Sequence, residues 1–156
     1  AEAIQQAQAV AERLEESLTV LAADTIVVLG ADTIGVDEQG EILGKPTHAD
    51  DARAMLKRLR GRSHMVSTAF TLHRQHADSV QEATYREVTI VTMRDYSDDE
   101  IDAYIATGDP FDKAGSYAIQ HKGFAPVANI DGDYHNVVGL PLARVKVALR
   151  EFGFVL

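Results

Sequence analysis

The chain has 156 residues, 46% of them apolar and 25% charged, which is enough for one globular domain with its own core. Its 15 Lys and Arg against 24 Asp and Glu give a formal net charge of −9, which argues against binding to a nucleic-acid backbone. The chain has no cysteine, which excludes disulfides and thiolate chemistry. Its longest apolar stretch is much shorter than the roughly 18 residues that a membrane-spanning helix needs.

The spacing of apolar residues predicts alternating helices and strands. In chain order these are a helix at 1–16, a strand at 25–29 ended by Gly30, extended chain at 34–36, a strand at 41–43, a helix at 47–60, strands at 64–72 and 85–93, a helix at 97–106, a strand at 124–130, a strand at 137–138 and a helix from Pro141 to about Phe152. This order predicts an α/β (α+β) domain around a mixed β-sheet.

Local signals sharpen some of these boundaries. Residues 97–100 form a full capping box, and residues 47–50 resemble one, with Asp in place of Glu. The alternating strands at 64–72 and 85–93 predict an antiparallel pair, with a loop or hairpin end over residues 74–79.

The segment from Thr25 to Pro46 carries the first candidate site. Asp32 follows the apolar run, and ligands of open α/β sheets bind beyond the carboxyl ends of the strands. An aspartate there can hold a divalent cation or activate water. Lys45 follows Gly44, and a lysine beside a glycine can neutralise a phosphate. The alternative is that Asp32 caps a turn and Lys45 is a solvated surface cation.

Residues 112–120 form the second candidate segment, with the sequence DKAGSYAIQ. The small residues after Lys113 let a ligand approach the backbone, and Gln120 can read a base edge through its donor and acceptor. The alternative is a connection with an exposed lysine. A third segment, residues 136–142, reads as a strand, a turn and a helix that begins at a proline, and a structural role is favoured.

Taken in order, these segments resemble the Maf family of nucleoside triphosphate pyrophosphatases. The resemblance rests on GADTI at 30–34, ILGKP at 42–46, the apolar helix face from 52 to 59 with Gly61, His64 and Thr68, DKAGSYAIQ at 112–120, and residues 137–142. These motifs span nearly the whole chain, and their specificity lies in their order.

The resemblance implies a Maf/ITPase-like fold, with an elongated mixed sheet flanked by helices and two lobes around a phosphate-binding cleft. It implies hydrolysis of a nucleoside triphosphate to the monophosphate and pyrophosphate with a divalent cation, Mg²⁺ or Mn²⁺. Asp32 matches the catalytic aspartate, which accepts a proton from water and helps to hold the cation. Lys45 and Lys113 match the lysines that face the phosphates, and Thr33 and Gln120 match positions tied to base selection.

Further expectations follow from the resemblance. One subgroup favours dTTP and UTP and another favours 7-methyl-GTP; this sequence keeps the Asp-Thr and Lys-Ala-Gly text of the dTTP/UTP type. The family implies a homodimer. The net charge predicts no nucleic-acid partner, the lack of a long apolar stretch predicts no membrane partner, and the lack of cysteine fits a cytoplasmic protein. Asp24 shares the Ala-Asp-Thr-Ile text, but Asp32 is preferred because it follows the apolar strand.

The chain departs from the family pattern at its start. Residues 1–156 are expected to form a single Maf-like domain without the initial strand and the Ser-x-Ser-Pro-Arg-Arg segment, which supplies arginines for the phosphates. Gln6 stands where the family usually has a lysine. The expectation is a truncated piece or a member that has lost part of its site.

Two other classes of function stay open beside the enzyme. One is a nucleotide-binding regulatory module that affects cell division or septum formation without turnover, and the other is a structural domain without a ligand. His73 and His76 have a spacing that could suit a metal, but a solvated loop is favoured because no third ligand is nearby in sequence.

Overall fold

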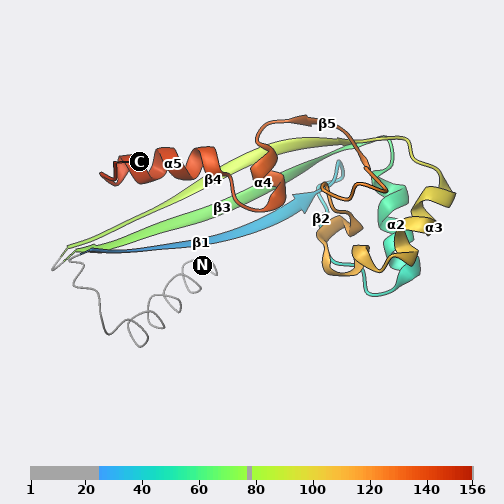
Figure 1. Cartoon of the computed structure of the whole chain (residues 1–156), viewed down its shortest axis with the longest axis horizontal. Coiled ribbons are helices and arrows are strands. Elements are labelled where there is room, and N and C mark those ends of the chain that lie inside the picture. The colour runs from blue at the N-terminus through green and yellow to red at the C-terminus, as the bar shows by residue number, and fades with distance from the viewer. Residues whose placement is uncertain (1–24, 77–78, 156) are drawn as a thin grey trace. The chain divides into compact units, whose positions relative to one another are not determined.

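The computed structural model describes residues 25–76 and 79–155 (Figure 1). The helix predicted over residues 1–16, with Gln6, lies outside the described residues, as does Asp24. Within the described part of the chain, no helix is long and apolar enough to cross a membrane.

Five strands form one sheet in the order β2-β1-β3-β4-β5. They are β1 (Thr25–Val36), β2 (Ile42–Leu43), β3 (Ser63–His76), β4 (Ser79–Met93) and β5 (Val127–Asp131). The predicted α+β class is confirmed, but the sheet is antiparallel rather than mixed. The short link of residues 77 and 78 between β3 and β4 explains part of this, because so short a connection joins only antiparallel strands.

The long strands extend beyond their predicted ends. β1 runs unbroken through Gly30, so Asp32 lies within a strand and not beyond its carboxyl end. β1 lies beside the long strand β3, while β2 pairs with it only at Gly35 and Val36. Pairing along a long neighbouring strand overrides the local tendency of glycine to interrupt a strand. β3 and β4 also occupy most of the predicted 74–79 loop, since they end at His76 and begin at Ser79.

Polar cross-strand pairs help to extend β3 and β4. The Thr71 and Thr84 hydroxyls are 2.8 Å apart, and His73 Nδ1 lies 3.1 Å from Glu82 Oε2. Such pairs stabilise neighbouring strands without an apolar pattern. The side chain of His76, the second histidine of the candidate metal pair, lies outside the described part of the structure.

Two helices follow their capping signals closely. Helix α3 (Asp98–Ala106) begins after Ser97, and the predicted capping box with Glu100 is present. Helix α2 (Ala49–Leu59) begins two residues later than the predicted start at residue 47, with His48 as its N-cap. His48 Nδ1 accepts the Asp51 N–H at 3.1 Å. The Asp51 carboxylate in return accepts the Thr47 N–H at 2.9 Å, so Asp51 takes the place of the glutamate of a capping box.

The strand predicted at 137–138 is instead the end of the short helix α4 (Tyr134–Val138). Asn136 in this helix is fully buried, and its Nδ2 donates to the Val66 carbonyl at 3.1 Å and to Thr89 Oγ1 at 3.0 Å. These long-range bonds cannot be read from the local apolar pattern. Helix α5 (Leu142–Glu151) begins after Pro141, as predicted within one residue.

Two compact units divide the chain, and each has its own apolar core. Among the described residues, unit 1 comprises 25–33, 68–76, 79–87 and 139–155, and unit 2 comprises Ile34–Ser67 and Val88–Val138. The core of unit 1 is Phe70, Leu72, Val145, Ala148 and Phe152. The core of unit 2 includes Leu43, Leu56, Leu59, Met93, Tyr96, Tyr104, Tyr117 and Phe124.

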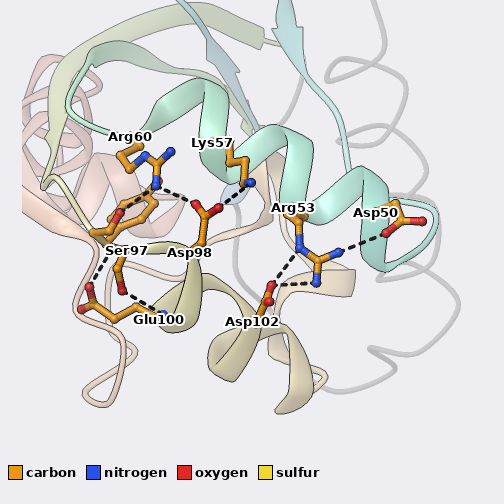
Figure 2. A network of polar contacts seen from close by, with 9 residues as sticks. Asp50, Arg53, Lys57, Arg60, Ser97, Asp98, Glu100 and Asp102 are labelled. Carbon is orange, nitrogen blue, oxygen red and sulfur yellow. Dashed lines mark hydrogen bonds and ion pairs between the residues drawn. The ribbon is translucent and has the colours of Figure 1, made fainter.

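Charged side chains join α2 to α3 within unit 2, as Figure 2 shows. Arg53 contacts Asp102 at 2.6 Å, while Asp98 accepts from both Lys57 at 2.7 Å and Arg60 at 2.8 Å. All of these groups are partly exposed, so each pair contributes at most about 1 kcal/mol. Their value lies in the network, which fixes the register of the two helices that carry the larger core.

Removing the cap of α3 tests this account of the helix start. We expect Ser97→Ala to lower the free energy of unfolding by about 1 kcal/mol, because the Glu100 N–H loses its acceptor. Ser97→Thr keeps the hydroxyl and should stay close to the parent in a urea titration. Equal losses in the two variants would contradict a role for the hydroxyl.

Candidate active site

Asp32 and Thr33 lie next to each other in β1 and belong to unit 1. Asp32 is exposed, and its Oδ1 accepts the Thr33 N–H at 2.9 Å. Its Oδ2 makes no hydrogen bond or ion pair within residues 25–76 and 79–155. The carboxylate is therefore held at one oxygen and open at the other, as a proton acceptor or cation ligand requires.

The Thr33 hydroxyl is already engaged within its own unit. It lies 2.8 Å from Thr68 Oγ1 and donates to the Gly139 carbonyl at 3.2 Å. A hydroxyl has a single proton. When the Thr33 hydroxyl donates to the Gly139 carbonyl, the Thr68 hydroxyl must therefore be the donor in the 2.8 Å bond between the two threonines. Thr33 thus links β1 to β3 and to the start of the final helix.

The two predicted lysine segments meet in unit 2. The Gly115 N–H donates to the Gly44 carbonyl at 2.9 Å, which places the backbone after Lys113 against the backbone before Lys45. The side chains also share a neighbour, because Lys113 first and Lys45 to a smaller degree lower the pKa of the Asp112 carboxyl. The structure therefore brings together two residues that lie far apart in sequence.

The two lysines differ in their surroundings. Lys45 is exposed and makes no hydrogen bond or ion pair with any residue that the structure describes. The Lys113 ammonium donates to Asp112 Oδ1 at 2.6 Å, to the Asp109 carbonyl at 3.0 Å and to Asp109 Oδ1 at 3.3 Å. These contacts, above all the bond to Asp112, raise the pKa of Lys113. Lys45 is thus open to an incoming anion, while Lys113 is fixed by three acceptors.

A left-handed turn connects Lys113 to the rest of its segment. Two short 3₁₀ helices, η1 (Asp109–Asp112) and η2 (Ala114–Ser116), flank the lysine. Gly115 has φ +73°, and a Cβ there would meet Leu43 Cδ1 at 3.3 Å. Ser116 also has a positive φ of 63° and is fully buried, with its hydroxyl donating to Met55 Sδ at 3.1 Å. The packing of η2 holds this turn in a conformation that glycine favours.

The buried pair of His64 and Tyr117 supports the same segment. The sequence does not reveal this pair, because the two residues lie far apart in the chain. His64 Nε2 lies 2.7 Å from the Tyr117 hydroxyl, and the rings meet edge to face. Burial lowers the pKa of His64 to about 4 and raises the pKa of Tyr117. The imidazole is neutral at pH 7, so the pair is a structural link between β3 and the 113–120 segment.

Gln120 lies at the end of this segment, exposed, and its side chain makes no hydrogen bond within the described residues. The backbone before it is fixed, because the Ala118 N–H donates to the Tyr104 hydroxyl at 3.1 Å. The amide is therefore available to a ligand. Lys45, Lys113 and Gln120 all belong to unit 2, whereas Asp32 and Thr33 belong to unit 1.

The oxygen donors fit a cation that arrives with its substrate. Within the described part of the chain, no group of three or more His, Asp or Glu side chains could hold a metal ion. Mg²⁺ in phosphate-binding enzymes takes one or two carboxylates and completes its shell with water and phosphate oxygens. An exposed carboxylate with an open oxygen, such as Asp32, suits that arrangement, and a dedicated protein cage is not needed.

The family model described as "Maf-like protein" matches residues 1–152. The chain belongs to the Maf family. A dTTP/UTP pyrophosphatase of Dictyoglomus thermophilum is 48% identical over 130 residues, which cover 83% of this chain and 66% of the relative. One from Dictyoglomus turgidum is 44% identical over 154 residues (99% and 74%), and one from Bacillus cytotoxicus is 47% identical over 150 residues (96% and 71%). This Maf chain thus spans 66–74% of the length of these relatives.

The turn at Gly115 can be tested against a glycine in open space. We expect Gly115→Ala to destabilise the Maf chain by about 1–2 kcal/mol for its left-handed backbone, and by about 1 kcal/mol more for the contact with Leu43. Gly40 has φ +85° but nothing within 4 Å, so Gly40→Ala should show the backbone cost alone. Denaturant titrations of both variants measure the difference; equal costs would contradict the packing argument.

The pH dependence of stability should report the buried His64. Burial lowers the pKa of His64 from 6.5 to about 4. Between pH 4 and 6.5 this imidazole is therefore protonated in the unfolded chain and neutral in the folded chain. The free energy of unfolding should therefore fall as the pH drops from 6.5 to 4, with a slope from this group of up to about 1.4 kcal/mol per pH unit. His64→Gln should flatten that slope. An imidazole that titrates near 6.5 in an NMR experiment would contradict the burial.

Proposed function

We propose that this chain hydrolyses nucleoside triphosphates of the dTTP/UTP class to the monophosphate and pyrophosphate. The observation that carries the proposal is its identity of 44–48% to three relatives named dTTP/UTP pyrophosphatase, over 83–99% of the chain. The pairing of the Lys45 and Lys113 segments supports it, because a triphosphate needs cations close together on one surface.

Asp32 is the proposed general base. A water oxygen attacks the α-phosphorus, the bond from that phosphorus to the bridging oxygen of the pyrophosphate breaks, and the proton of the water passes to Asp32. The open Oδ2 of this carboxylate supports the role, and the bond from the Thr33 N–H to Oδ1 orients it. In the alternative role for Asp32, this carboxylate would instead hold Mg²⁺ or Mn²⁺, because an oxygen bound to a dication is a poor proton acceptor. Such a cation would withdraw charge from the phosphate oxygens.

The lysines have distinct proposed roles. Lys45 makes no ion pair with the described residues and would attract and bind the phosphates of the incoming substrate. Lys113 is held by Asp109 and Asp112 and would stabilise the charge that develops on the departing pyrophosphate. The net charge of −9 makes these local cations important, since the chain as a whole repels a triphosphate.

Base selection is assigned to Gln120 and Thr33 in this proposal. Gln120 supports it best, because its exposed amide offers both a donor and an acceptor to the edge of a pyrimidine. Thr33 donates to Gly139 and pairs with Thr68, so it would act on base selection indirectly, by fixing the local backbone. The cytoplasmic location stays a prediction, as do the homodimer and the cleft between two lobes that the family resemblance implies.

The decisive measurement is pyrophosphate release from dTTP, UTP, 7-methyl-GTP and ATP with Mg²⁺ or Mn²⁺. We expect release from dTTP and UTP, and we expect Asp32→Asn to lower kcat by about 100-fold or more because the variant loses its proton acceptor. The variant should keep its melting temperature, since Asp32 is exposed and asparagine retains an oxygen for the Thr33 N–H.

Asp95→Asn is the matched control, because Asp95 is exposed and has no ion pair within the described residues. It should leave turnover unchanged. Near-normal turnover of Asp32→Asn would refute the general base. If dTTP raises the melting temperature while no pyrophosphate appears with any substrate, the chain is instead a nucleotide-binding module without turnover.

A further inference from the structure

We propose that Tyr104 is a positioning residue, whose hydroxyl fixes both the Lys113 ammonium and the backbone that leads to Gln120. This inference rests on the proposed function. Tyr104 lies in α3, outside the three segments that the sequence singles out, and the sequence gives it no role. Its significance comes from what its hydroxyl contacts in unit 2.

The hydroxyl makes two hydrogen bonds in opposite directions. It donates to Asp109 Oδ2 at 3.0 Å and accepts the Ala118 N–H at 3.1 Å. The other carboxylate oxygen, Asp109 Oδ1, accepts from the Lys113 ammonium at 3.3 Å. One phenol therefore connects the carboxylate that holds Lys113 to the peptide that lies just before Gln120.

The ring of Tyr104 is itself held rigidly. Only 2% of the residue is exposed, its ring stacks on Phe124 with centroids 4.4 Å apart, and His121 meets it edge to face at 4.7 Å. Burial raises the pKa of the hydroxyl, which therefore stays protonated and keeps its donor for Asp109. Ring contacts with Phe124 and His121 help to hold the side chain, and the hydroxyl bonds Asp109 and Ala118.

The bonds of the hydroxyl bear on the chemistry more than on folding. Lys113 has three donors, and Asp109 supplies two of its three acceptors through its carbonyl and Oδ1. If the Asp109 side chain turned away, Lys113 would keep the Asp109 carbonyl and Asp112 but lose its contact with Asp109 Oδ1, so its ammonium would be held less firmly. Misplacing a charge by about 1 Å weakens transition-state stabilisation, so the effect should fall on kcat more than on KM.

Tyr96 provides a matched control in the same core. It is 1% exposed, its ring lies 4.9 Å from that of Phe124, and its hydroxyl donates to the Leu56 carbonyl at 2.8 Å. Leu56 lies in α2 and away from the 113–120 segment in sequence. Tyr104→Phe and Tyr96→Phe thus each remove one buried hydroxyl. The first loses the bond donated to Asp109 and the bond accepted from Ala118, whereas the second loses only the bond donated to Leu56.

The experiment measures steady-state pyrophosphate release from dTTP for both variants of the full chain. We expect Tyr104→Phe to lower kcat by about tenfold or more with a smaller change in KM, and Tyr96→Phe to stay within about twofold. Tyr104→Phe should lose more thermal stability than Tyr96→Phe, because it removes two hydrogen bonds and not one. A Tyr104→Phe kcat within about twofold of the parent, or equal losses of kcat in both variants, would overturn the inference.

Amide hydrogen exchange separates this inference from the proposed function. The Ala118 amide should exchange about tenfold faster in Tyr104→Phe but not in Tyr96→Phe, with the Met93 amide, bonded to Arg62, as an internal reference. If the parent chain releases no pyrophosphate, the proposed function fails. The inference is then decided by the Ala118 amide: faster exchange in Tyr104→Phe alone supports it, and an unchanged exchange rate overturns it.

Discussion

The hydrogen bond from the Gly115 N–H to the Gly44 carbonyl is the contact on which the candidate lysine site depends. It forms only because the chain takes a left-handed turn at Gly115 and continues through Ser116, and because Leu43, from the segment before Gly44, packs beside that turn. A single backbone bond thereby sets the spacing of Lys45 and Lys113 around Asp112. The side chains contribute the charge, but the turn decides where it lies.

Buried polar groups hold this arrangement from behind. His64 supports Tyr117, and the Tyr104 hydroxyl joins Asp109 to the Ala118 N–H. Neither group carries charge at neutral pH: a phenol is neutral there in any case, and burial lowers the pKa of the His64 imidazole to about 4. Neutral donors and acceptors can therefore fix the segment without altering its electrostatic balance, which is left to the lysines and the carboxylates beside them.

The balance of charge at Lys113 has a consequence for how the site would act. Two aspartates already neutralise this lysine, whereas Lys45 has no such partner among the described residues. An incoming phosphate would meet Lys45 first, and Lys113 would act from a fixed position near Asp112. A rigid cation needs no reorganisation as charge develops, which is where a preorganised site gains over water.

The sequence by itself determined the family motifs, the α+β class, the capping box of α3 and the candidates Asp32, Lys45, Lys113 and Gln120, because these depend on residues close together in the chain. Only the tertiary structure decided that β1 passes unbroken through Gly30, that Asn136 lies in a helix, and that His64 and Tyr104 support the 113–120 segment. Each of these rests on a strand pairing or hydrogen bond between distant residues, and such long-range contacts override local propensity without leaving a local pattern.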